Sequence, residues 1–83
     1  DLVKVGDVSH YYTNIEVAVV ELLDTLRVGD LVAFKGYITD FSQVVRSMEI
    51  EHQQVREAKA GDSIGLKVSD RVREGDQVYK IME

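Results

Sequence analysis

The sequence contains no cysteine and no proline. Without cysteine the chain cannot form a disulfide scaffold or a thiolate metal site. Without proline, nothing in the sequence interrupts the hydrogen-bond ladder of a β-sheet. No apolar run approaches the roughly 18 residues that a membrane span requires, and the acidic N-terminus does not resemble a signal peptide. We therefore expect a cytoplasmic protein with no membrane contact.

Motifs for catalysis and cofactor binding are also missing. No Gly-rich phosphate-binding loop of the Walker type is present, which excludes GTP hydrolysis. The two histidines, His10 and His52, lack the spacing of a zinc site. Residues 61–65 (GDSIG) match the nucleophile-elbow pattern of hydrolases, but that motif needs a helix after it, and residues 64–68 alternate as a strand. We expect no catalytic residue, no metal and no cofactor, so the sequence predicts a binding protein rather than an enzyme.

What the chain does contain suits one small folded domain. Its 83 residues and 45% hydrophobic content predict a single domain that spans residues 1–83. The net charge of −5, from 15 acidic and 10 basic residues, would repel nucleic acid overall. Residues 1–50 hold four bases and eight acids, whereas residues 51–83 hold six and seven. Any RNA contact would thus need a local basic patch in the second part; the alternative is an ordinary solvated surface. The candidate residues are Arg56, Lys59, Lys67, Arg71 and Arg73.

Glycine followed by aspartate is the most regular pattern in the chain. Four of the six glycines precede Asp, and Gly29, Gly61 and Gly75 share one local frame. An apolar residue lies three positions before each of these three glycines, and another lies three positions after it. Glycine tolerates positive φ, and aspartate can hydrogen-bond the neighbouring backbone beyond the turn. Three such turns before short strands favour a closed or nearly closed β-barrel, which leaves no exposed strand edge.

Alternating apolar residues predict strands over residues 2–8, 31–37, 43–53, 63–68 and 77–82. Gly6 predicts a bulge in the first of these, and residues 9–14 are expected to form a loop. Residues 15–27 fit two structures equally well by pattern: the apolar spacing suits a helix, whereas the β-branched valines and a second alternation suit a strand. The aromatic run of residues 10–12 (HYY) could stack unpaired bases or support a turn by packing.

Residues 47–68 read SMEIEHQQVREAKAGDSIGLKV, with Met-Glu-Ile in a strand, then a loop, then Ala-Gly-Asp-Ser-Ile-Gly. This stretch resembles domain 2 of the translational GTPases, the β-barrel of elongation factor Tu and its relatives. The resemblance extends over roughly residues 3–81 and favours the strand interpretation of residues 15–27. It implies a six-stranded antiparallel Greek-key β-barrel, in a stand-alone form or as a domain of a longer factor.

The resemblance also implies a function. In the elongation factor, the glutamate that matches Glu49 helps to bind the terminal adenosine of aminoacyl-tRNA; the alternative is a solvated carboxylate. A ribosome- or tRNA-associated binding module is therefore predicted, and the other interpretation is a protein-interaction module or accessory domain of a larger enzyme. The oligomeric state is left open. The predicted nucleic-acid contacts are Glu49, His52, Arg56, Lys59, Arg71 and Arg73.

Overall fold

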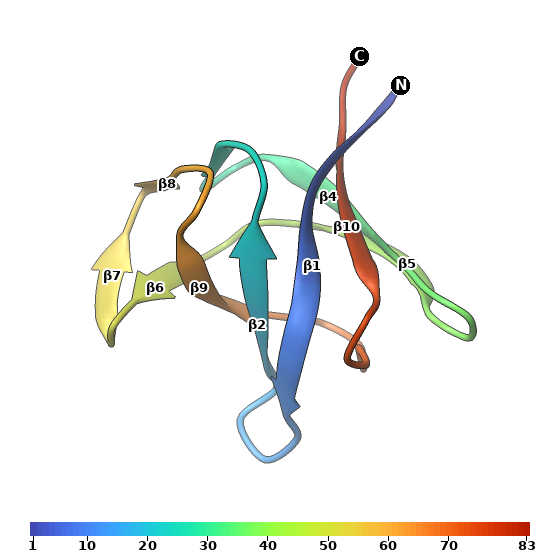
Figure 1. Ribbon diagram of the computed structural model, residues 1–83, viewed down its shortest axis with the longest axis horizontal. Helices are drawn as coiled ribbons and strands as arrows, with labels where there is room; N and C mark the ends of the chain where they lie inside the picture. Colours follow the sequence, from blue (N-terminus) through green and yellow to red (C-terminus); the bar gives the residue numbers. More distant parts are fainter.

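The computed structural model describes residues 1–83 as ten β-strands without a helix (Figure 1). The predicted all-β, antiparallel class is therefore confirmed. The structure contains no helix that is long and apolar enough to span a membrane. The strands are β1 (Leu2–Tyr12), β2 (Val17–Leu22), β3 (Leu26–Arg27), β4 (Leu31–Lys35), β5 (Asp40–Val44), β6 (Met48–Ile50), β7 (Gln53–Val55), β8 (Glu57–Ala58), β9 (Ser63–Lys67) and β10 (Gln77–Ile81).

Eight of the strands form one strongly curved antiparallel sheet in the order β5-β4-β10-β1-β2-β9-β6-β7, while β3 pairs with β8. Strands β5 and β7 lie at opposite sides of this sheet (Figure 1). A side chain joins the β5 edge to the end of β9. The Gln43 amide donates to the Lys67 carbonyl at 2.9 Å and accepts from the Ser69 amide at 2.7 Å. A side-chain amide, and not a backbone ladder, therefore links β5 to this part of the chain.

The prediction of a six-stranded closed barrel is wrong in strand number and in closure. The predicted strand over residues 43–53 is divided among β5, β6 and β7. The ladder between β5 and β4 ends at Val44, and the chain reverses at Glu51 and His52 between β6 and β7. No backbone ladder joins the two edge strands, β5 and β7, so the sheet stays open between them.

Residues 15–27 form strand β2 and the short β3, not a helix. Ala18, Val20 and Leu22 point into the core, while Val17, Val19 and Glu21 lie on the outer face. The predicted bulge at Gly6 is confirmed, because the register of β1 against β10 shifts between Lys4 and Gly6. The loop predicted over residues 9–14 is shorter, since β1 continues to pair with β2 as far as Tyr12.

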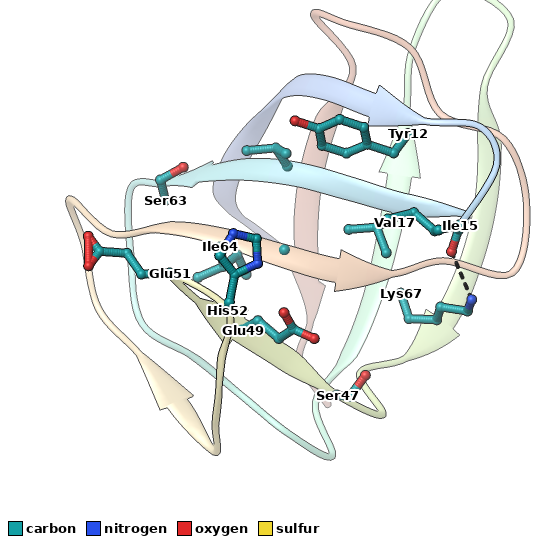
Figure 2. Close-up of a pocket in the computed structure, with 12 residues that line it drawn as sticks. Tyr12, Ile15, Val17, Ser47, Glu49, Glu51, His52, Ser63, Ile64 and Lys67 are labelled. Atoms are coloured by element: carbon teal, nitrogen blue, oxygen red, sulfur yellow. Dashed lines mark hydrogen bonds between the residues drawn. The ribbon is translucent and has the colours of Figure 1, made fainter.

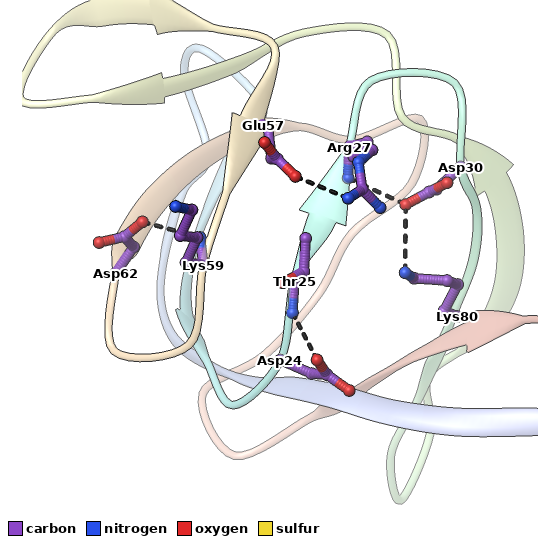
Figure 3. A network of polar contacts seen from close by, with 8 residues as sticks. All are labelled: Asp24, Thr25, Arg27, Asp30, Glu57, Lys59, Asp62 and Lys80. Atoms are coloured by element: carbon purple, nitrogen blue, oxygen red, sulfur yellow. Dashed lines mark hydrogen bonds and ion pairs between the residues drawn. The ribbon is translucent and has the colours of Figure 1, made fainter.

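The three Gly-Asp corners adopt one geometry. Gly29, Gly61 and Gly75 have φ of 100°, 93° and 92°, values that residues with a side chain rarely adopt. The following aspartates each accept a hydrogen bond from the backbone amide three residues earlier, at 2.9, 2.8 and 2.8 Å. The aspartates therefore bond backward across the turn, and not to the backbone beyond it as predicted. Figure 3 shows two of these corners, with Arg27 also paired to Glu57 at 2.8 Å.

The apolar residues that flank these corners build the core. The residues three before and three after each glycine are all at most 1% exposed. They are Leu26, Ala58, Val72, Val32, Ile64 and Val78. Phe34, also fully buried, stacks on Phe41 with ring centroids 4.9 Å apart. The turns thus fix the directions in which the strands enter the core, and the outer face of the sheet remains free to carry a site.

Candidate binding groove

A groove of about 330 Å³ lies on the outer face of strands β2, β9 and β6 (Figure 2). Its volume is at the lower end of the range for small-ligand pockets. Side chains from the end of β1 lie on one side of it, and those from β6 and the β6–β7 turn lie on the other. The lining residues are Tyr12, Ile15, Val17, Val19, Ser47, Glu49, Glu51, His52, Ser63, Ile64, Gly65 and Lys67.

The floor of the groove is apolar and has a gap at Gly65. This residue pairs with Val19 on one side and with Glu49 on the other. A Cβ atom at Gly65 would meet the Val17 Cγ1 atom at 3.4 Å, an ordinary contact, and the φ of this glycine lies outside the left-handed region. A larger residue would therefore fit the backbone here and fill the groove. Glycine inside a strand is typical of places where another group approaches closely.

The charges around the groove are mainly negative. Glu49 is half-buried beside the floor, and one of its carboxylate oxygens accepts a hydrogen bond from the Gln54 amide at 2.9 Å. The Lys67 ammonium group donates to the Ile15 carbonyl at 2.8 Å, so this positive charge is held at one end of the groove (Figure 2). Glu51 adds a second carboxylate to the lining. A ligand that carries a positive charge is thus favoured over a phosphate.

The turn that carries two of the lining residues is strained. Glu51 and His52 have φ of 49° and 67°, and they form the two-residue connection of the β6–β7 hairpin. Positive φ at both positions is characteristic of a type I′ turn, which usually contains Asn-Gly. Residues with a Cβ atom raise the energy of this conformation, and such strain clusters at functional sites. The combination of a hollow floor, a half-buried carboxylate and a strained turn makes this groove the candidate site.

Only two of the six predicted contact residues lie in this groove, Glu49 and His52. Arg56 and Lys59 flank the short strand β8. Arg71 and Arg73 lie in the connection between β9 and β10. The Arg73 guanidinium donates to the Thr39 hydroxyl at 2.9 Å, so this side chain braces a loop. The four basic residues therefore do not converge on the groove.

The aromatic run of residues 10–12 is divided between two environments. His10 and Tyr12 pack edge to face with centroids 4.4 Å apart, and Tyr11 packs against the core. The outer-face residues of β2 and β9 were missed as part of a site, although their alternation with core residues and the strand glycine were visible in the sequence. These residues are Val17, Val19 and Gly65.

The fold has counterparts among solved structures. The crystal structure of the C-terminal domain of a putative U32 peptidase from Geobacillus thermoleovorans superposes with a TM-score of 0.88 and 25% sequence identity, covering 94% of this chain and 91% of that chain. Its selenomethionine variant gives a TM-score of 0.87 at 24% identity, covering 92% and 96%. The class defined by this fold is therefore a small β-domain that also occurs at the end of a longer polypeptide.

A curated protein adds a sequence relationship. "Uncharacterized protease MJ0090" from Methanocaldococcus jannaschii is 39% identical over 82 residues, which are 98% of this chain and 20% of that protein. The chain thus spans about a fifth of the length of the relative that it matches. No known protein-family model matches the sequence.

These findings overturn the suggested kinship with translation factors. The relatives carry peptidase names, so the predicted function of a translation-factor-like module that associates with the ribosome or RNA is wrong. The cause of the error is turn chemistry. The Gly-Asp pattern that carried the resemblance occurs at three corners of this same chain with one geometry. The pattern therefore indicates a type of turn between strands and not a protein family. The second interpretation, an accessory domain of a larger enzyme, agrees better with these relatives.

Proposed function

We propose that this chain is a non-catalytic accessory domain of a larger peptidase-like protein and that its groove binds a segment of polypeptide. The matched relative is named as a protease and is about five times as long as the matched segment. The related solved domain is described as the C-terminal domain of a putative peptidase. A domain of this size beside a peptidase would contribute by holding or orienting a polypeptide.

The non-catalytic part of this proposal is supported by the hydrogen bonds of the groove serines and histidine. The Ser63 hydroxyl, which belongs to the GDSIG segment, donates to the Glu21 carboxylate at 2.8 Å. The same carboxylate oxygen also accepts from the Ser9 hydroxyl at 2.9 Å. His52 makes no hydrogen bond to Ser63 or Ser47, so neither groove serine is paired with a histidine. Ser63 is the first residue of strand β9, and the helix that follows the serine in a nucleophile elbow is absent.

The groove best fits the side chain of a lysine or arginine in an extended polypeptide. The apolar stem of such a side chain can lie on Val17 and Val19 over the gap at Gly65, as long cationic side chains do on apolar surfaces. Its charged end would then reach the Glu49 carboxylate, which is paired across Gly65 from Val19. The single observation that carries the proposal is this placement of a half-buried carboxylate beside an unfilled apolar floor.

The test uses five blocked pentapeptides, acetyl-Gly-Gly-X-Gly-Gly-amide, in which X is Lys, Arg, Leu, Phe or Glu. Each is titrated into the ¹⁵N-labelled chain and followed by amide chemical shifts. We expect the Lys and Arg peptides to shift Val19, Glu49 and Gly65, with a dissociation constant on the order of 1 mM for one bound side chain. The Glu peptide should bind at least about fivefold more weakly, because it meets the groove carboxylates.

Two results would contradict the proposal. Equal shifts with the Lys and Glu peptides would show that the groove does not select by charge, and the absence of any shift at Gly65 would remove the groove as a site. Catalysis is checked separately by incubating the chain with unfolded casein and looking for new peptides by mass spectrometry. We expect none, and cleavage that survives purification to constant specific activity would refute the non-catalytic role.

A further inference from the structure

A second surface of the molecule carries a row of aliphatic side chains across four strands. On the outer face of β5, β4, β10 and β1, Val44 pairs with Leu31 and Leu2 pairs with Ile81. The register of β10 against β4 places Lys80 opposite Val32, so its next step brings Ile81 beside Leu31. We call these four residues the aliphatic row. Side chains that are adjacent in this way form one continuous apolar strip.

The aliphatic row is unpartnered. Leu2, Leu31 and Val44 are 52%, 40% and 41% exposed. The neighbouring inward-facing residues of the same strands, Val32 and Phe34, are fully buried, so the core is complete without the row. A scattered exposed aliphatic residue is ordinary, but three exposed ones in register with the half-buried Ile81 across adjacent strands are characteristic of an interaction surface.

The position of the chain ends indicates what covers this row. Asp1 and Met82 exchange two backbone hydrogen bonds, of 3.0 and 2.8 Å, and both ends leave the domain on the same side (Figure 1). These residues immediately adjoin Leu2 and Ile81, one end of the row. In the M. jannaschii relative the matched segment is 20% of the chain, so the remaining four-fifths must continue from one or both of these ends.

We infer that the aliphatic row docks against the remaining part of the longer protein, as an intramolecular domain interface. This inference rests on the accessory-domain part of the proposed function but is independent of what the groove binds. The occupant would be an apolar surface of the adjoining domain, because the row itself carries no charge. The opposite end of the sheet, at the β1–β2 turn, would stay in solvent, with the groove accessible beside it.

The absence of natural cysteine in this chain makes a labelling test specific. Val44→Cys is introduced into the row and Asn14→Cys into the exposed β1–β2 turn as a matched control. Each variant is made in the 83-residue chain and in a chimera in which this chain replaces the matching fifth of the M. jannaschii protein. The rate of maleimide labelling is followed by peptide-resolved mass spectrometry, which separates these sites from any other cysteine.

We expect Val44→Cys to be labelled at least about tenfold more slowly in the chimera than in the free chain, with the Asn14→Cys rates equal. Adding Leu31→Lys to the chimera should return the Val44→Cys rate to within about twofold of the free chain. Equal Val44→Cys rates in the chimera and the free chain would overturn the inference. Slow labelling that Leu31→Lys leaves unchanged would also do so.

If the chimera fails to fold, a second pair of proteins replaces it in the labelling test. The full-length M. jannaschii protein and its isolated matching segment are then compared, with cysteines at the positions that align with Val44 and Asn14. The related solved domain was crystallised by itself, which supports the use of an isolated segment. Loss of peptide binding at Gly65 would refute the groove without affecting the labelling rates, so the two proposals fail in different experiments.

Discussion

The two outer surfaces of this domain differ although both are built from alternating strand residues. The groove over β2, β9 and β6 is hollow, carries carboxylates and includes the strained Glu51–His52 turn. The aliphatic row over β5, β4, β10 and β1 is uncharged, and its residues lie in a regular ladder. Backbone strain and an unfilled groove lower the stability of the fold, and a surface with a purely structural role would need neither. The difference indicates that the groove is suited to a ligand that exchanges, and the row to a permanent neighbour.

Of the changes that would distinguish the two surfaces, filling the groove should have the largest effect on peptide binding. Gly65→Leu places a side chain over the apolar floor without backbone strain, so we expect the dissociation constant of the Lys pentapeptide to rise at least about tenfold, or 1.4 kcal/mol. The melting temperature should not fall, because glycine is a poor strand residue. Ser42→Leu, on the outer face of β5, is the matched control and should leave peptide binding unchanged.

Relaxing the strained turn should stabilise the domain and weaken peptide binding. Replacing Glu51 by Asn and His52 by Gly gives the sequence that a type I′ turn prefers. We expect a stabilisation of about 1 kcal/mol, which raises the melting temperature by about 4–8 °C in a domain of this size. Peptide binding should weaken, because two groove side chains are lost. A calorimetric scan that shows no stabilisation would contradict the account of strain.

Removing one negative charge should reduce affinity without blocking the groove. We expect Glu49→Gln to weaken binding of the Lys pentapeptide about three- to fivefold, the range for a partly exposed ion pair. The Leu pentapeptide should bind this variant as it binds the wild type. The remaining affinity for the Lys peptide should also depend less on salt. An unchanged Lys-to-Leu ratio would show that Glu49 does not contact the ligand.

The smallest effect is expected in the aliphatic row of the isolated chain. Val44→Thr keeps the shape and the strand preference of the side chain at a position that is 41% exposed. We expect the free energy of unfolding to change by less than about 0.5 kcal/mol and peptide binding to stay constant. Chemical denaturation gives the first quantity and the shift titration the second. A loss above about 2 kcal/mol would mean that the row belongs to the core.

The sequence predicted the parts of the fold that depend on local chemistry. The corners at Gly29, Gly61 and Gly75 followed from turn propensities. The strand breaks between Val44 and Gln53 could not be predicted, because the residues alternate without a glycine or proline to mark them. The link between β5 and the segment after β9 depends on long-range hydrogen bonds of the Gln43 side chain, which no local pattern contains.

The candidate site was predicted less well than the fold. Glu49 and His52 were identified, but through a resemblance that proved wrong, and the four basic residues were expected to join them. Charge in the sequence gives no position in space, so residues on separate connections were grouped as one patch. The apolar floor was overlooked because Val17 and Val19 suited a core strand equally well. Their outward direction became apparent only from the pairing of β2 with β1 and β9.

The most direct measurement is the set of intermolecular nuclear Overhauser effects between the Lys pentapeptide and the methyl-labelled chain. The account predicts contacts from the lysine methylene protons to the methyl groups of Val17 and Val19. It predicts none to the methyl groups of Leu31 and Val44. Contacts to the aliphatic row in place of the groove, or no contacts to either surface at saturating peptide, would contradict it.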